Sequence, residues 1–216
     1  METAEAVARL NRQLPQLQRQ QTLPAAWVAV HRAVLRSLAT RGRPLDEGEI
    51  AAMPGIDDAR GVIGRLADLD LIVTDTDRVR VLGAYPMTTE PTPHRLRLPA
   101  CEVFAMCALD AVSVSAMFGL EVDIRSRCHV TGTPIHIRQL GMRIVQAVPS
   151  EQVRVGIRWQ APVGFAAHSM CMEMVFLRDP ATAAGWRRGG EAHIDLFTLP
   201  EAVAFGAAFF VPLLSD

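Results

Sequence analysis

The segment that most constrains the fold is "EVFAMCALDAVSVSAMFGLE", residues 102–121, because its interior holds a single charged side chain, Asp110. All neighbouring side chains are apolar or small, so protein must cover the segment on every side. We expect a helix over residues 102–118 that ends at Gly119. An unpaired buried carboxylate takes up a proton rather than staying ionised. The segment therefore predicts a core helix whose carboxyl group can change its protonation state.

The rest of the chain divides into a helical first half and a second half rich in strands. Helical patterns cover residues 3–14, 24–42, 46–53 and 57–70, with Asp46 and Asp57 as expected N-caps. Two alternating strands around a polar turn follow at 71–83. The last three of these helices and the hairpin follow the order of a winged helix.

Strand patterns then alternate with short helices. The expected strands cover 121–130, 134–139, 153–160, 168–177 and 193–199, and the expected helices 179–190 and 200–214. Hairpin-linked strands packed with helices indicate an α+β fold with a mostly antiparallel sheet. We expect a winged-helix-like domain at 1–83, a linker rich in Pro and Thr at 84–95, and an α+β catalytic domain at 96–216.

Charge and hydropathy exclude two classes of partner. The net charge is −1, and residues 41–80 hold nine acids against six arginines, whereas a surface that contacts phosphates should be basic. We therefore expect no nucleic-acid partner. The N-terminus is too polar for a signal peptide, and the apolar run near the C-terminus contains Pro212 and is shorter than the roughly 20 residues of a membrane span. We expect a cytoplasmic protein with no membrane contact.

Common cofactor and catalytic motifs are missing from the sequence. The four cysteines form no CxxC pair and the six histidines no HExxH, which argues against zinc sites and thioredoxin chemistry. No GxGxxG, P-loop or GxSxG motif occurs. In a reducing compartment the cysteines should be free thiols, available for catalysis or for soft metals.

Cys107 lies three residues before Asp110. On a helix this spacing puts both side chains on one face, with Cβ atoms roughly 5–6 Å apart. A thiol beside a carboxyl group that can exchange a proton is a candidate reactive pair. The alternative is that Cys107 is a small core residue and that Asp110 makes only structural hydrogen bonds.

Strand alternation separates the remaining cysteines. Between 168 and 177, the methionines at 170, 172 and 174 share the core face, so Cys171 should point to the opposite face, as a reactive thiol or as an inert strand residue. His168 should begin this strand. Cys128 shares an apolar face with Val122, Ile124 and Val130, which predicts a structural role. We expect no function for Cys101.

Three segments together resemble the organomercurial (alkylmercury) lyase family: "FAMCALDAVSVSAMFG", "SRCHVTGTPIHI" and "SMCMEMVFL". The resemblance implies that Cys107 and Cys171 bind mercury and that Asp110 transfers a proton and can also contact the metal. It makes Cys128 a structural cysteine. Two positions differ from the family pattern: Met106 replaces a common Trp, and Met172 replaces a second Cys found in some members.

The activity implied by this resemblance is protonolysis of a carbon–mercury bond, which gives a hydrocarbon and Hg(II). No cofactor is implied, since Hg(II) is the bound product. Small thiols or a mercuric reductase would remove the ion, and the chain would act as a monomer or weak homodimer. The alternative is a noncatalytic thiol protein of the same fold that binds or senses a metal, including a DNA-binding regulator.

Overall fold

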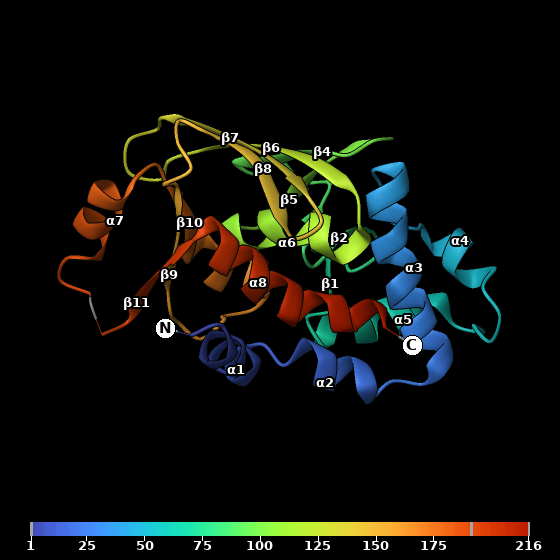
Figure 1. Ribbon diagram of the computed structural model, residues 1–216. Helices are drawn as coiled ribbons and strands as arrows, with labels where there is room; N and C mark the ends of the chain where they lie inside the picture. The colour runs from blue at the N-terminus through green and yellow to red at the C-terminus, as the bar shows by residue number, and fades with distance from the viewer. Residues whose placement is uncertain (1, 191, 216) are drawn as a thin grey trace.

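The computed structural model describes residues 2–190 and 192–215 and contains two antiparallel sheets with helices packed against them (Figure 1). The larger sheet has the strand order β1-β2-β3-β5-β4-β6-β7-β8, and the smaller one the order β10-β9-β11. The strands are β1 Ile72–Thr74, β2 Val81–Ala84, β3 Met87–Thr88, β4 His94–Arg97, β5 Glu102–Ala105, β6 Glu121–Arg127, β7 Pro134–Leu140, β8 Arg143–Val148, β9 Arg154–Arg158, β10 Met174–Leu177 and β11 Ile194–Thr198. The predicted mixture of helices and antiparallel strands is confirmed.

Helices precede, interrupt and close the sheets. They are α1 Thr3–Gln13, α2 Gln16–Gln21, α3 Ala25–Arg41, α4 Glu47–Ala51, α5 Ala59–Asp68, α6 Ala108–Phe118, α7 Pro180–Arg187 and α8 Leu199–Phe210, with 3₁₀ turns η1 Ala166–His168, η2 Met170–Glu173 and η3 Val211–Leu214. Asp46 caps α4 in a capping box, as expected. The cap of α5 is Asp58 rather than Asp57, since the Asp58 side chain accepts from the N–H of Gly61.

Helix α6 is the central element that the sequence predicts, and it lies between the large sheet and α8 (Figure 1). Nearly all of its residues are buried. Gly206 of α8 allows the close approach, because a Cβ at this position would lie 1.9 Å from Ser113 Oγ of α6. The site residues carried by α6 are therefore enclosed by protein on both sides.

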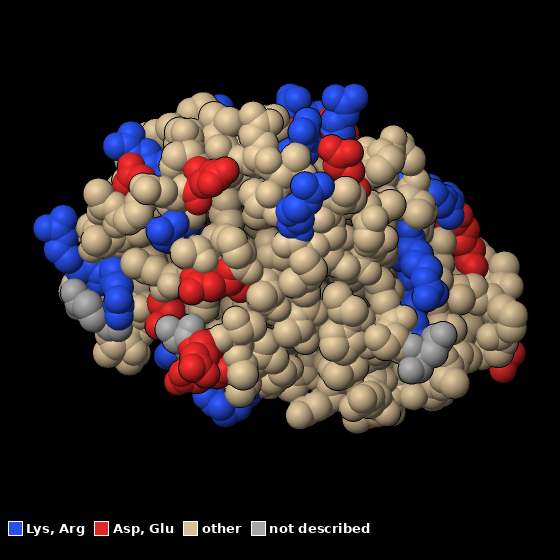
Figure 2. Space-filling view, in the orientation of Figure 1, with Lys and Arg blue, Asp and Glu red and all other residues tan. Residues whose placement is uncertain are grey.

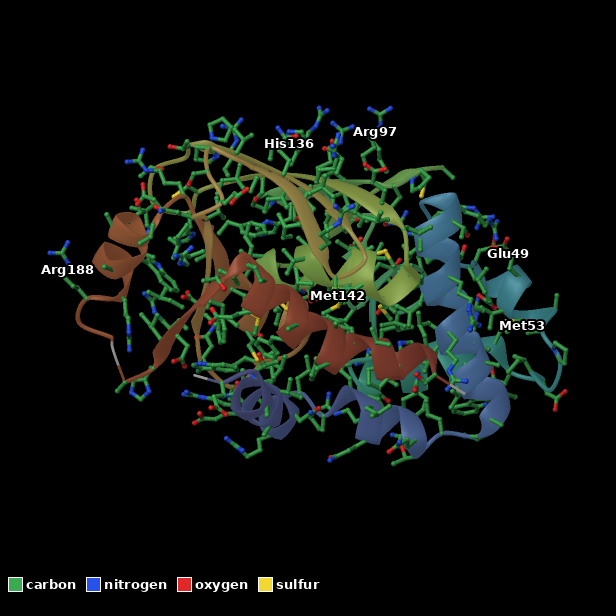
Figure 3. The ribbon with its side chains drawn as sticks, in the orientation of Figure 1. Glu49, Met53, Arg97, His136, Met142 and Arg188 are labelled. Atoms are coloured by element: carbon green, nitrogen blue, oxygen red, sulfur yellow. The ribbon has the colours of Figure 1, made fainter. Side chains whose placement is uncertain are left out.

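The outer face of the large sheet is polar. Strands β6 and β7 alternate between buried and more exposed residues, which places Val122 and Ile137 inside. In Figure 3, Arg97 and His136 project outward from this sheet. In Figure 2, arginine and acidic side chains are interspersed around a broad uncharged area below the centre of the view. On the side of the molecule seen in Figure 2, the described residues therefore form no continuous basic surface.

Two expected segment boundaries differ from the structure. The helix predicted over 102–118 begins only at Ala108, because Glu102–Ala105 forms β5 and pairs with β3 and β4. The expected linker at 84–95 contains β3 and the start of β4, and its Tyr85 is fully buried. Short sheet pairings in this region override the turn-like composition. Strand β8 was not expected.

The strand predicted over 168–177 is wrong in its first half. Residues 170–173 form the 3₁₀ turn η2, and β10 begins at Met174. A 3₁₀ turn rotates successive side chains by about 120° rather than alternating them. As a result Cys171 is buried, whereas Met172, assigned to the core, is 61% exposed. Val130, placed on an apolar face with Cys128, is 52% exposed because it follows the end of β6.

Within the described part of the chain, no helix combines the length and the apolar character that crossing a membrane requires.

Candidate functional site

Cys107 is the N-cap of α6. Its backbone is extended, and its sulfur accepts a hydrogen bond from the N–H of Asp110 at 3.4 Å. The proximity of the two residues therefore comes from capping geometry rather than from two positions on a helix face. Cys107 Sγ also lies 3.7 Å from Met174 Sδ. The thiol sits at the positive end of the helix, where a thiolate is stabilised.

Asp110 occupies the first turn of α6 and is 2% exposed. Its Oδ2 atom lies 3.9 Å from Cys171 Sγ, which is supplied by η2. The ligand atoms of Cys107, Asp110 and Cys171 all lie within 4.8 Å of one another, so the three side chains could hold one metal ion. The structure brings together the three residues that the sequence analysis selected.

Burial governs the protonation of this cluster. Burial raises the pKa of Asp110 to about 7, even though hydrogen bonds from Cys107 and Cys171 act to lower it. Burial, a hydrogen bond to Cys171 and the nearby Asp110 raise the pKa of Cys107 well above its usual value. A hydrogen bond from Cys107 lowers the pKa of Cys171. Burial and the Asp110 charge outweigh this effect, so the pKa of Cys171 is also raised. The carboxyl group can thus exchange a proton near neutral pH while both free thiols stay protonated.

A cavity of about 510 Å³ leads to the cluster. The exposed Met172 and the buried Cys171 both line this cavity. Three further buried side chains also line it: Met106, Met174 and Phe176. Among the described residues, Cys107 and Asp110 are not part of the lining. A molecule in the cavity therefore reaches the Cys171 sulfur before it reaches the Cys107 sulfur.

Comparison with known proteins places this geometry in a family. The alkylmercury lyase (MerB) family model matches residues 87–211. The alkylmercury lyase of Staphylococcus epidermidis is 31% identical over 81% of this chain and 77% of its own length. That of Streptomyces lividans is 27% identical over 79% of this chain and 76% of its own length.

The chain belongs to the alkylmercury lyase family.

A solved structure shows the same fold. The mercury-bound form of MerB2 superposes with a TM-score of 0.77 over 93% of this chain and 98% of that chain, at 23% identity. The alkylmercury lyase fold therefore extends across the first half of the chain as well as the segment that matches the family model.

The other predicted residues lie around the lyase cavity or away from it. Cys128 is buried, and it lines the cavity together with His168. His168 belongs to the 3₁₀ turn η1 rather than to a strand. Cys101 lies apart, with its sulfur 3.5 Å from the Ala39 carbonyl. Met106, at the position of the common Trp, contributes to the cavity wall.

Sequence reasoning missed His94, which lines the cavity and packs edge-on against Phe176 at a centroid distance of 5.6 Å. Its Nδ1 atom lies 2.8 Å from Ser126 Oγ, and burial lowers its pKa to about 4, so the ring is neutral. The residue lies in the segment interpreted as a linker, and no motif marks it. Only the pairing of β4 with β6 reveals its place beside the site.

Proposed function

We propose that this alkylmercury lyase cleaves carbon–mercury bonds with Cys107, Asp110 and Cys171 as its reacting groups. The observation that carries the proposal is the convergence of two thiols and one carboxyl group within 4.8 Å. Thiolates are soft ligands and bind soft mercury tightly. A carboxyl group with a pKa of about 7 can both accept and donate a proton at neutral pH.

The position of the cavity supports an order of steps. The organomercurial cation meets the Cys171 thiol first, which forms a sulfur–mercury bond and passes its proton to the Asp110 carboxylate. Cys107 then adds the second sulfur and releases its own proton. As the carbon–mercury bond breaks, carbon keeps the electron pair and takes the proton held by Asp110. The products are a hydrocarbon, Hg(II) bound to two sulfurs, and one proton released to solvent.

The apolar walls and deep burial support this chemistry in two ways. Exclusion of water preserves the proton on Asp110 for the leaving carbon. The fixed cap geometry of Cys107 holds the second sulfur beside the carboxyl group before substrate arrives. No step in this sequence needs a cofactor. External thiols, or a mercuric reductase, would remove Hg(II) from the sulfurs.

The proposal also covers the domain organisation, the localisation and the partners of the enzyme. The order of helices α3 to α5 and the β1–β2 hairpin supports a winged-helix-like segment at 1–83, joined through 84–95 to a catalytic unit at 96–216. We also propose that the enzyme is cytoplasmic and acts as a monomer or weak homodimer, without a membrane or nucleic-acid partner. The net charge of −1 supports the absence of a nucleic-acid partner.

Hydrocarbon release tests the function. The protein is incubated with phenylmercury and excess small thiol, and benzene is measured by gas chromatography. We expect release well above a control with thiol alone. Tight Hg(II) binding with no benzene above this control would instead favour the noncatalytic metal-binding alternative.

A further inference from the structure

Two buried side chains from the first half of the molecule hold the start of the segment that carries Cys171. The Ala166 N–H donates to Asp70 Oδ2 at 3.0 Å, and the Ala167 N–H donates to the Tyr85 hydroxyl at 2.9 Å. The Tyr85 hydroxyl in turn donates to Asp70 Oδ1 at 2.6 Å. Two consecutive amides are thus bound by two side chains that also bind each other.

The Asp70 end of this arrangement is itself fixed. Asp70 follows α5 with a left-handed backbone, φ +51°, a conformation that non-glycine residues adopt uncommonly. Gln16 of α2 donates to the Asp70 carbonyl at 3.2 Å, and Arg19 donates to the Leu69 carbonyl at 3.0 Å. Helix α2 therefore secures the turn that presents the Asp70 carboxylate to Ala166.

The contacts are deeply buried. Tyr85, the one tyrosine of the chain, is fully buried, and Asp70 is 7% exposed. Burial raises the pKa of Tyr85 well above its usual value, and the charges of Cys171 and Asp70 raise it further. The phenol therefore stays protonated and keeps the hydrogen that it donates to Asp70.

The held segment has little regular structure of its own. From Ala166 to Cys171 the chain runs through η1 and η2, two short 3₁₀ turns. Such turns have poor hydrogen-bond geometry and stay short. The placement of the Cys171 sulfur beside Asp110 and Cys107 thus depends on outside contacts that fix its backbone.

We infer that Asp70 and Tyr85 are positioning residues of the lyase site, which hold Cys171 in reach of Cys107 and Asp110 through the amides of Ala166 and Ala167. The inference rests on the proposed function. It gives the turn after α5 and the segment between β2 and β3 a role in assembling the two-sulfur site.

The first test measures Hg(II) retention and needs no turnover. Wild type and Tyr85→Phe are loaded with one equivalent of HgCl₂ and titrated with a small monothiol, and the thiol concentration that removes half of the bound Hg(II) is measured after gel filtration. Wild type should retain Hg(II) up to the higher thiol concentration, because two converging sulfurs chelate it. Loss of the hydroxyl releases the Ala167 amide, and displacement of Cys171 should weaken retention about tenfold to a hundredfold.

The second test measures turnover of phenylmercury. In Tyr85→Phe, kcat/KM should fall about tenfold or more, because the displaced Cys171 is the cavity-lining thiol that captures the substrate. Asp70→Asn keeps the side-chain shape but removes the charge that binds the Ala166 amide and the Tyr85 hydroxyl. It should reproduce both effects, and it replaces Tyr85→Phe in both tests if that variant does not fold.

Gln20→Met is the matched control. Gln20 is buried, and its amide nitrogen lies 2.8 Å from His31 Nδ1 of α3 and donates to the Leu213 carbonyl at 3.0 Å. Its replacement therefore weakens the packing of α2 against α3 and η3 without removing a hydrogen bond to Ala166 or Ala167. It should retain Hg(II) as wild type does. Wild-type retention in Tyr85→Phe and Asp70→Asn, or equal loss in Gln20→Met, would overturn the inference. Selective loss of retention in the two variants, with no benzene from wild type, would overturn the proposed function and leave this inference standing.

Discussion

The Cys171 sulfur lies 3.9 Å from the Asp110 carboxylate oxygen, although 61 residues separate them in the chain. Asp110 is fixed by α6, and Cys171 is carried by the 3₁₀ turn η2. With Cys107 capping the same helix, one carboxyl group lies within reach of two thiols. This arrangement is the basis of the predictions below.

Serine variants of the two cysteines should fail at different steps. Cys107→Ser should still capture phenylmercury, because Cys171 lines the cavity, but it should release benzene at least about 100-fold more slowly. Cys171→Ser should lose rapid capture as well. Intact-protein mass spectrometry detects the adduct. Cys101→Ser is the control and should behave as wild type, since its sulfur lies against the end of α3. Equal capture by both variants would contradict the proposed order.

Activity should depend on the ionisation of Asp110. Because burial raises the pKa of this carboxyl group to about 7, acidic solution protonates it and removes the base that accepts a thiol proton. We therefore expect kcat/KM to fall as pH decreases below about 7, by about tenfold for each further unit. Circular dichroism at each pH excludes unfolding as the cause. A flat profile from pH 5 to 8 would show that Asp110 is not the proton acceptor.

The same raised pKa affects stability. The folded protein binds the Asp110 proton more tightly than the unfolded chain, so the free energy of unfolding falls as pH rises from about 4 to about 7 and then levels off. Asp110→Asn removes this loss. Relative to wild type it should gain stability between pH 4 and pH 8, by about 4 kcal/mol at the most. Urea denaturation at both pH values measures the difference, and a constant difference would contradict it.

The packing of α8 on α6 gives a prediction that does not involve the chemistry. Gly206→Ala should lower the free energy of unfolding by about 1–3 kcal/mol, because its Cβ would collide with Ser113 Oγ. Gly64 is the matched control, since a Cβ there meets nothing within 4 Å. Gly64→Ala should stabilise α5 by roughly 0.5–1 kcal/mol. Urea denaturation of both variants checks the opposite signs.

Local interactions explain why part of the site could be predicted from the sequence. Cys107 and Asp110 lie within one turn, so a charge in an apolar segment identified the pair directly, although capping rather than a shared helix face joins them. The position of Cys171 could not be predicted in this way, because the hydrophobic periodicity indicated a strand where a 3₁₀ turn occurs. Its assignment depended on family resemblance, and its contact with Asp110 is a tertiary fact that no local pattern contains.

In the fold, too, the elements formed by local interactions were predicted and those formed by pairing between distant segments were not. Helix α3 and the β6–β7 hairpin follow from periodicity and turn signals within each segment. Strands β3 and β5 are short and gain their structure from pairing with each other, so composition alone suggested a linker and a longer helix. His94 and Tyr85 were missed for this reason, since both lie in the segment interpreted as a linker.

A single-turnover experiment with Asp110→Asn tests the central claim most directly. The variant and wild type are each mixed with less than one equivalent of phenylmercury, and benzene and the protein-bound adduct are measured over time. The account predicts that wild type releases one benzene per phenylmercury, whereas Asp110→Asn holds the intact phenylmercury adduct and releases benzene at least about 100-fold more slowly. Benzene release by Asp110→Asn at the wild-type rate would contradict it.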